Sequence, residues 1–414
     1  MDSNTILNLE GFNLIRPILT LTILIISMIA IINCGGSSST SDGKSDSKSD
    51  SADTSADRFK DEPTDAAVSM SPGEFRRAED MGAKRSGLNA VLLNDGTAFI
   101  FGGRTDGSSG FWLNYNFTSE IFDGNTDTWT MSGEMNTARA DAIGIVLSDG
   151  KVLAAGGEGE QNKAINSTEI WDPATGEWTE ISPLIEERDS TDAVLLNDGT
   201  VLVAGGRSEA YSLMNTVEIF DPKTNEWTSA APMMDTRIAH TTTLLQDGRV
   251  LVTGGGKVDP PYHKSAEIFD PETGEWSPAG ELNLSRRSHT ATLLQDGRVL
   301  IAGGNGKRMI AEVWDPTDMS FTKTGSLNIP RADHQAILLN DGRVLVMGGI
   351  GNRDSGELWD SATGEWMMSG EMEVGRYEFG ATILSDGRVI VAGGNSAAGV
   401  SGSGMTATTE VFTP

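Results

Sequence analysis

The chain has 414 residues, among them 49 glycines, and its 59 acidic against 31 basic residues give a formal net charge of −28. Such a surface repels phosphate backbones and anionic headgroups, which argues against nucleic acid as a partner. The single cysteine, Cys34, excludes an intramolecular disulfide, and the abundance of glycine favours short strands joined by tight turns.

The N-terminus carries an apolar run at residues 18–32, which is fifteen residues long. A membrane span needs about 20 such residues, whereas a signal-peptide core is shorter. The following segment, 31–35 (IINCG), resembles a bacterial lipobox. The resemblance implies a signal peptide at 1–33 and a lipid anchor on Cys34, with the protein held at the cell envelope, at the outer membrane. An uncleaved hydrophobic anchor and ordinary secretion are the alternatives.

Residues 34–72 are rich in serine, aspartate and glycine and lack a periodic apolar pattern. This composition is typical of a disordered tether. Random-coil scaling gives about 38 residues a reach of roughly 35 Å. We therefore expect a single folded domain at 73–414, held away from the membrane.

The rest of the chain consists of seven repeated units. Each unit contains an Asp-Gly pair, a Gly-Gly pair shortly after it, and an arginine ten residues before the aspartate. In the fourth unit, four strands called a to d are predicted at 240–246, 249–255, 265–271 and 275–279. The Asp-Gly pair predicts a type I′ hairpin turn between strands a and b.

The Gly-Gly pair, the strand-c run Glu-Ile-Phe-Asp-Pro and the strand-d tryptophan resemble kelch repeats, and are closest to those of bacterial kelch proteins. The resemblance implies an all-β, seven-bladed kelch-type β-propeller. A four-stranded sheet that is apolar on both faces also needs neighbours on both sides, which a ring provides. The last unit ends after strand c, and Phe75 lies ten residues before Arg85, as Trp129 does before Arg139. We expect a strand around Phe75 to complete the last blade and close the ring.

Two charged residues recur in every unit, and we predict that they form structural ion pairs, with a functional arginine ring as the alternative. The arginines are Arg85, Arg139, Arg188, Arg237, Arg286, Arg331 and Arg376, and the strand-c glutamates are Glu120, Glu169, Glu218, Glu267, Glu312, Glu357 and Glu410.

Three histidines, His240, His289 and His334, each follow a repeat arginine by three residues. No carboxylate shares this pattern, so we interpret them as hydrogen-bonded core residues and not as a metal cluster. Accordingly, neither a metal nor a cofactor is expected.

The b–c and d–a loops share one face of the ring, and the b–c loops are irregular in length and sequence. Variable loops on a rigid scaffold commonly carry binding sites. The loop of the first blade, with Trp112 outside the repeated core positions, is the best candidate for contact. The alternative is that the loop aromatics only pack onto the blades. The candidate ligand-binding residues are Trp112, Tyr115, Tyr211, Tyr262, His263 and Tyr377.

These features favour a monomeric binding or scaffolding module of the cell envelope, with a protein or glycan ligand. A kelch-fold carbohydrate-active enzyme such as a sugar mutarotase is the alternative, and a purely structural surface protein is a third reading. No catalytic residue is assigned; Glu378 and Asp333 are channel-facing acid–base candidates. Copper chemistry of the galactose oxidase kind is excluded, because it requires a cysteine crosslinked to a tyrosine and the repeats contain no cysteine.

Overall fold

The computed structural model describes residues 71–414, apart from 107–113, 257–259, 306–308, 352 and 397–403. The expectations for residues 1–70, including lipidation of Cys34, lie outside this part of the chain, as does Trp112. No helix in the described ranges is long and apolar enough to cross a membrane.

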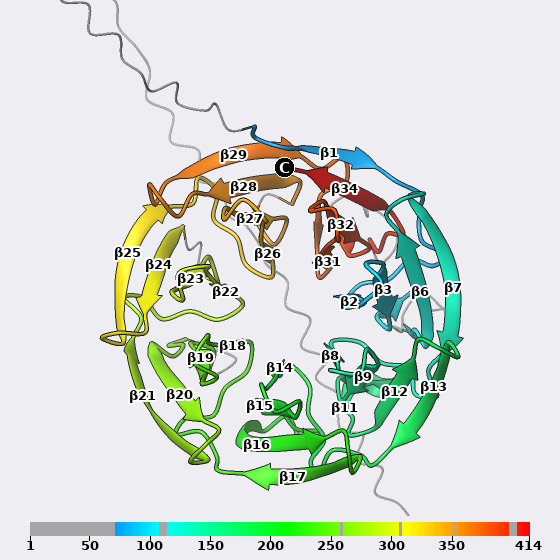
Figure 1. Cartoon of the computed structure of the whole chain (residues 1–414), viewed down its shortest axis with the longest axis horizontal. Helices are drawn as coiled ribbons and strands as arrows, with labels where there is room; N and C mark the ends of the chain where they lie inside the picture. The colour runs from blue at the N-terminus through cyan, green and yellow to red at the C-terminus, as the bar shows by residue number, and fades with distance from the viewer. Residues whose placement is uncertain (1–70, 107–113, 257–259, 306–308, 352, 397–403) are drawn as a thin grey trace, which may run out of the picture. The chain divides into compact units, whose positions relative to one another are not determined.

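Seven four-stranded antiparallel sheets surround a central axis, with strand a innermost in each blade (Figure 1). The strands of each blade, innermost first, are as follows: β2 (Asn89–Leu92), β3 (Ala98–Phe101), β6 (Thr118–Asp123) and β7 (Thr128–Glu134) in blade 1; β8 (Ile143–Val146), β9 (Val152–Ala155), β12 (Thr168–Asp172) and β13 (Glu177–Ile181) in blade 2; β14 (Asp192–Leu195), β15 (Val201–Arg207), β16 (Leu213–Asp221) and β17 (Glu226–Ala230) in blade 3; β18 (Thr241–Leu244), β19 (Val250–Thr253), β20 (Ser265–Asp270) and β21 (Glu275–Glu281) in blade 4; β22 (Thr290–Leu293), β23 (Val299–Ala302), β24 (Ile310–Asp315) and β25 (Ser320–Ser326) in blade 5; β26 (Gln335–Leu338), β27 (Val344–Met347), β28 (Ser355–Trp359) and β29 (Trp366–Glu371) in blade 6; β31 (Gly380–Ile383), β32 (Val389–Ala392), β34 (Thr409–Thr413) and β1 (Glu74–Arg77) in blade 7. The prediction of a seven-bladed all-β propeller is confirmed.

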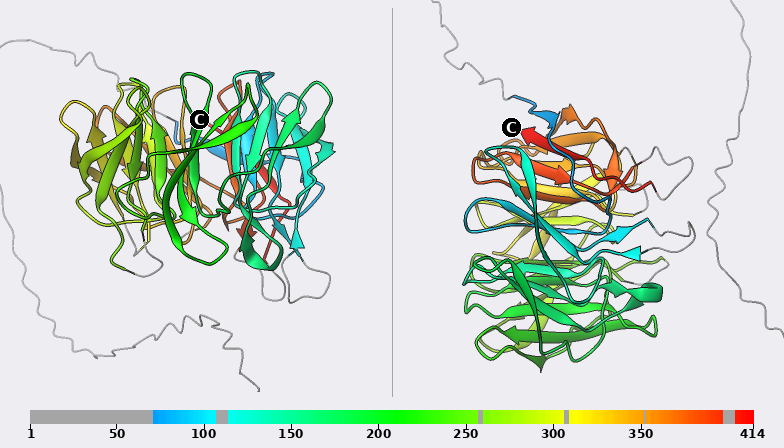
Figure 2. Two further views of the ribbon diagram at one scale, coloured as in Figure 1. Left: turned by 90° about the horizontal axis from the view of Figure 1, so that it is seen from below. Right: turned by 90° about the vertical axis from the view of Figure 1, so that its right-hand side faces the viewer.

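Short elements extend three blades on the loop face. Seen from its edge, the ring has hairpin turns at one face and the b–c connections at the other (Figure 2). These elements are the pairs β4 (Arg104–Thr105) with β5 (Asn114–Tyr115), β10 (Glu158–Gly159) with β11 (Lys163–Ala164), and β30 (Arg376–Tyr377) with β33 (Asn395–Ser396), and the 3₁₀ turn η1 (Glu160–Asn162).

The ring closes as predicted. Strand β1 pairs with β34, and Phe75 lies opposite Phe412 with ring centroids 4.9 Å apart. Phe75 also packs into the cluster of buried side chains between blades 6 and 7, which includes Leu345 and Val391. The N-terminal strand therefore covers an edge that the C-terminal strand would otherwise expose.

The Asp-Gly hairpin turn differs from the type I′ turn that the sequence suggested. In the Asp-Gly pair of the first blade, only Gly96 takes a positive φ, of 88°, and its N–H donates to the Leu93 carbonyl at 3.0 Å. This is a type I turn followed by a left-handed glycine, which is the common three-residue hairpin loop. Asp95 stabilises it, because its side chain accepts the N–H of Thr97 at 3.0 Å.

The second glycine of each Gly-Gly pair joins neighbouring blades. The N–H of Gly103 donates to the carbonyl of Arg139 in the next blade at 2.8 Å. The same bond recurs at all seven blade junctions and ends with Gly394 donating to Arg85 at 2.8 Å. Only glycine fits here, because a Cβ on Gly103 would lie 2.9 Å from the Ser86 carbonyl, and φ is +100°.

Each repeat arginine clamps strands b and c of its own blade to the preceding d–a loop. Arg139 donates to the Gly156 and Ser167 carbonyls at 3.1 and 2.7 Å and forms an ion pair with Glu169 at 2.7 Å. Glu169 in turn accepts the backbone N–H of Asn136 at 2.7 Å. An Arg–Glu ion pair of the same kind occurs in all seven blades. These contacts bury the arginines and occupy their guanidinium groups, so the arginines do not form a ring that a ligand in the channel could reach.

Candidate ligand site at the channel mouth

The channel mouth on the loop face is framed by the residue that lies two positions after each repeat arginine. We call this set the mouth ring. Backbone hydrogen bonds link its members from blade to blade: Gly87 donates to the Glu378 carbonyl at 2.8 Å, and Asp141 donates to the Gly87 carbonyl at 2.8 Å. All members have a positive φ, between 47° and 63°. The mouth ring is Gly87, Asp141, Ser190, Ala239, Ser288, Asp333 and Glu378.

Residues other than glycine rarely adopt this left-handed conformation, which costs of order 1–3 kcal/mol each. It persists here because the inter-blade bonds fix the backbone. In each blade this residue lies just before strand a, the innermost strand, so the mouth ring lies near the axis. Their identities differ from blade to blade, whereas the adjacent arginine and Gly-Gly positions are uniform.

Arg104 occupies the space that the missing side chain of Gly87 leaves. A Cβ on Gly87 would lie 2.7 Å from Nη1 of Arg104. From this position the guanidinium forms ion pairs with Asp141 and Glu158 of blade 2, and it lies 3.8 Å from Glu378 of blade 7. One arginine therefore links the carboxylates of two other blades.

Three carboxyl groups of the mouth ring have raised pKa values. Burial raises the pKa of Glu378, and the nearby carboxylates of Asp141 and Asp333 add to the effect. Burial also raises the pKa values of Asp141 and Asp333. The side chains of Asp141 and Glu378 are still 38% and 36% exposed. A carboxyl group accepts hydrogen bonds from ligand hydroxyls when it is ionised and can also donate one when it is protonated.

Three of the four tyrosines stack against an arginine on the loop face. The guanidinium carbons of Arg207, Arg287 and Arg353 lie 5.0, 5.0 and 4.7 Å from the ring centroids of their respective tyrosines. Arg207 is also fixed by a two-pronged contact with Asp189, at 3.0 and 2.9 Å. The tyrosines, in the same order, are Tyr211, Tyr262 and Tyr377.

The candidate residues proposed from the sequence do not form one cluster. Tyr115 is buried, and its hydroxyl lies 3.0 Å from Glu158 and 2.7 Å from Asn162. Burial and the Glu158 carboxylate raise the pKa of this hydroxyl. Tyr115 therefore supports the Arg104 network from behind and offers little surface to a ligand.

The other candidate residues differ in how exposed they are and in whether they bond to the protein itself. Tyr211 is 57% exposed, whereas Tyr262 and Tyr377 are half-buried. His263, in the b–c loop of blade 4, contacts the Thr236 carbonyl through Nε2 at 3.1 Å and so packs against the d–a segment that enters that blade. The sequence reading missed Arg104, Asp141 and Glu158. The signal that could have found them is the departure from repetition directly after the repeat arginine and after Gly-Gly.

The three strand-a histidines are buried between blades. Nε2 of His289 lies 3.2 and 3.0 Å from the hydroxyls of Thr241 and Thr253. Burial lowers the pKa values of His240 and His334 to about 3, so both are neutral at physiological pH. Among the described residues, no group of three or more histidine, cysteine, aspartate or glutamate side chains is placed to hold a metal ion.

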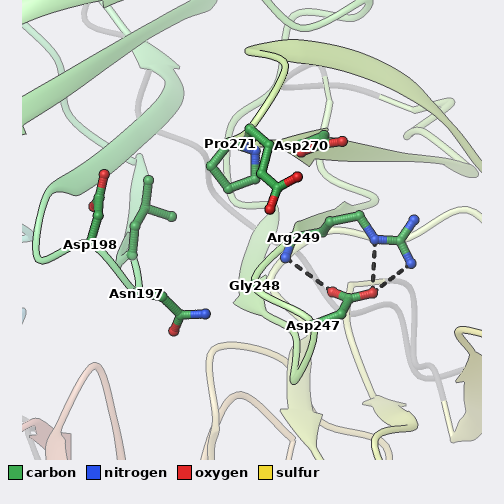
Figure 3. A pocket seen from close by; sticks show the side chains of 9 residues that line it. Asn197, Asp198, Asp247, Gly248, Arg249, Asp270 and Pro271 are labelled. Atoms are coloured by element: carbon green, nitrogen blue, oxygen red, sulfur yellow. Dashed lines mark hydrogen bonds and ion pairs between the residues drawn. The ribbon is translucent and has the colours of Figure 1, made fainter.

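A cavity of about 430 Å³ lies on the opposite face, between the turns of blades 3 and 4 (Figure 3). Its main polar feature is Arg249, which pairs with Asp247 of the same turn at 2.7 Å. The same arginine–aspartate pair occurs in the corresponding turns of blades 5, 6 and 7. Because this pair recurs in four blades, we interpret it as stabilising the turns. The polar lining of the cavity is therefore repeated, whereas the residues at the channel mouth differ from blade to blade.

Asp192, at the start of β14, gives the fold a pH dependence. Burial raises its pKa from 3.8 to about 6, although its carboxylate accepts the N–H groups of Thr242 and Ala193 at 2.7 and 2.9 Å. The protonated form of Asp192 is favoured in the folded state. Its contribution to the free energy of unfolding is therefore complete below pH 3.8 and is lost as the pH rises through about 6. We expect a loss of about 1.4 kcal/mol in unfolding free energy between about pH 5 and about pH 7.5.

Urea unfolding of the Asp192→Asn variant at both pH values should lack this step. Asp198, whose pKa is lowered by its contacts with Thr200, titrates below the window, so the Asp198→Asn variant is the control. Equal pH slopes for the wild-type protein and the Asp192 variant would contradict the assignment.

The repeated blades, the Gly-Gly junctions and the variable loop face together define a kelch-type β-propeller. The chain belongs to the Attractin/LZTR1 β-propeller family, whose sequence profile matches residues 98–314. No curated protein sequence matches it.

Among solved structures, the chain is similar to a fungal alcohol oxidase of the AA5 family determined in complex with copper. The TM-score is 0.66 at 18% sequence identity, over 83% of this chain and 76% of the oxidase. At this identity the likeness concerns the fold alone. The described residues offer no matching set of copper donors, because the three repeat histidines are buried, and two of them, His289 and His334, are bonded to threonines.

Proposed function

We propose that the propeller is a binding or scaffolding module of the cell envelope, which recognises a protein or glycan ligand through its loop face. The observation that carries the proposal is the channel mouth, where the residue types differ between the seven otherwise uniform units. There, Arg104 links Asp141, Glu158 and Glu378 across blades, and half-buried tyrosines lie against arginines. Charged groups fixed in this way, next to aromatic rings, suit a polar ligand.

The test uses variants that alter the mouth and leave the fold intact. Gly87→Ala places a methyl group against Arg104 and Asp141. Its left-handed backbone is tolerable, because Ala239 adopts the same conformation in blade 4, at φ 48°. Tyr377→Ala removes an aromatic ring from the same rim. The control is Lys223→Ala, an exposed residue in the turn between β16 and β17.

We expect both mouth variants to lower ligand signal by about tenfold, in glycan arrays or in crosslinking on intact cells, because each loses about 1–2 kcal/mol of contact. The control should retain the signal. Loss of signal in the Lys223 variant, with both mouth variants unaffected, would move the binding site to the turn face and overturn the proposal.

A kelch-fold carbohydrate-active enzyme, such as a sugar mutarotase, is the second candidate. The observation that favours it is the set of mouth carboxyls with raised pKa values beside Arg104, which suits acid–base work. In this case Glu378→Gln would abolish sugar mutarotation followed by NMR while leaving ligand affinity within a few fold. A binding module would show no sugar conversion in either protein.

The envelope location is proposed from the apolar run at residues 18–32 and the lipobox-like segment that ends it. Lipidation of Cys34 would place the protein in the detergent phase of a Triton X-114 partition. We expect Cys34→Ser to move it to the aqueous phase. A variant retained in the detergent phase would point to an uncleaved apolar anchor.

A further inference from the structure

A second recess lies on the loop face, over blades 1, 2 and 3 and outside the channel mouth. It is a groove of about 580 Å³. Its walls come from Phe117 just before β6, the d–a segments that enter blades 2 and 3, the β10–β11 hairpin and the b–c loop of blade 3. We call it the hairpin groove. None of the residues assigned to the mouth site lines it.

The walls of the hairpin groove are fixed before any ligand arrives. Nζ of Lys163 on the hairpin forms an ion pair with Glu209 of blade 3 at 2.6 Å. The hydroxyl of Tyr211 donates to the Asn162 carbonyl at 3.3 Å, and the N–H of Ile165 donates to the Gly157 carbonyl at 3.0 Å. Such preorganisation reduces the ordering cost of binding.

The floor is apolar in part and incompletely covered. Phe117 is 43% exposed, although most phenylalanines of the ring are buried. Ile165 is half-buried beside it, and Ala138 and Ala164 also line the groove. A large exposed aromatic ring next to aliphatic side chains is typical of a contact surface for another molecule.

The charges of the hairpin groove are mainly acidic. Three carboxylates, Glu160, Glu187 and Glu209, line it together with the single ammonium of Lys163. Because Lys163 pairs with Glu209, the two exposed carboxylates of Glu160 and Glu187 give the groove its negative potential. The net charge of −28 reinforces this potential at long range.

We propose that the hairpin groove binds a short basic segment of a partner protein. A lysine or arginine of that segment meets Glu160 and Glu187, and a neighbouring apolar side chain covers Phe117 and Ile165. Charge complementarity selects the basic residue, and burial of the exposed aromatic ring selects its apolar neighbour. This interaction goes beyond the proposed function at the mouth, and its residues can be changed independently.

The test measures fluorescence anisotropy of a labelled peptide, Gly-Lys-Leu-Arg-Phe-Lys-Gly, with the full chain. Two matched peptides replace the basic residues by glutamate or the apolar residues by serine. We expect only the first peptide to bind well. The double variant Glu160→Lys with Glu187→Lys should weaken binding by about tenfold or more, and Phe117→Ser by about fivefold.

The control is Glu272→Lys with Glu275→Lys, which changes the net charge equally at exposed residues of the opposite face. It should leave affinity within about twofold, and the mouth variant Gly87→Ala should do the same. All of the groove residues that are substituted are exposed. The unfolding midpoints of these variants should therefore match that of the wild-type protein.

Four results would overturn the proposal. Equal weakening by the control pair would show general attraction to an acidic surface, and equal binding of the serine peptide would show that Phe117 plays no part. Absence of peptide binding up to about 1 mM would exclude the site, since weaker affinity lies below that of a specific contact. Dissociation of a dimer by the groove variant in sedimentation would assign the groove to a second copy of the chain.

Discussion

Replacing Arg139 by methionine is expected to destabilise the propeller by about 3–5 kcal/mol, because it leaves the buried carboxylate of Glu169 without its counter-charge. Both side chains are fully buried. The arginine also donates to the carbonyls of Gly156 and Ser167, and each carbonyl would lose this hydrogen bond. With a typical total stability of about 5–15 kcal/mol, this loss is a large fraction of the whole.

Denaturant unfolding of Arg139→Met, Glu169→Leu and the double variant would measure the coupling. The double variant should lose less than the sum of the two single variants, since it removes both charges together. The control is Lys163→Met, whose ion pair with Glu209 is about half exposed on each side and should contribute less than about 1 kcal/mol. A loss below about 1 kcal/mol for Arg139→Met would show that the buried pair does not hold the blade.

Removing the closing strand is the second change with a large expected effect. A chain truncated through Arg77 lacks β1, so β34 loses its backbone pairing along Glu410–Thr413. It also loses the packing of Phe75 between blades 6 and 7. Exposed strand edges promote association, so we expect a lower unfolding midpoint and aggregation. The single substitution Phe75→Ala should cost about 2–3 kcal/mol, less than for a fully buried phenylalanine because the ring is only half-buried.

The matched control for the truncation is a chain that begins at Ser71, which keeps β1 intact. Hydrogen exchange locates the effect: amides of β32 and β34 should lose protection first, whereas those of β15 on the far side of the ring should lose it last (Figure 1). If the two truncated chains melt together, the N-terminal strand does not lock the ring.

Much of the architecture could be read from the sequence because it depends on local patterns that occur seven times. The Asp-Gly and Gly-Gly pairs give the blade count, the direction of each strand and the face on which the variable loops lie. The offset of Phe75 from Arg85 gives the closure that pairs it with Phe412. The type of turn could not be read as safely, because Gly96 in a left-handed conformation is compatible with several hairpin loops.

The candidate site depended on the tertiary structure. Arg104, Asp141 and Glu378 are far apart in the chain, and nothing in their immediate neighbours indicates that they meet. They come together because the inter-blade bonds bring the same position of every unit to one ring around the axis.

Contacts between blades also determine whether an aromatic residue of the loops is exposed or buried. Tyr115 resembles a free binding residue in the sequence, yet contacts from the next blade bury it against Glu158. The sequence by itself determined a ring of seven blades, since short-range pattern fixes each sheet. Only the closed ring decided which side chains of different blades face one another, because those distances are set by packing around the axis and not by separation along the chain.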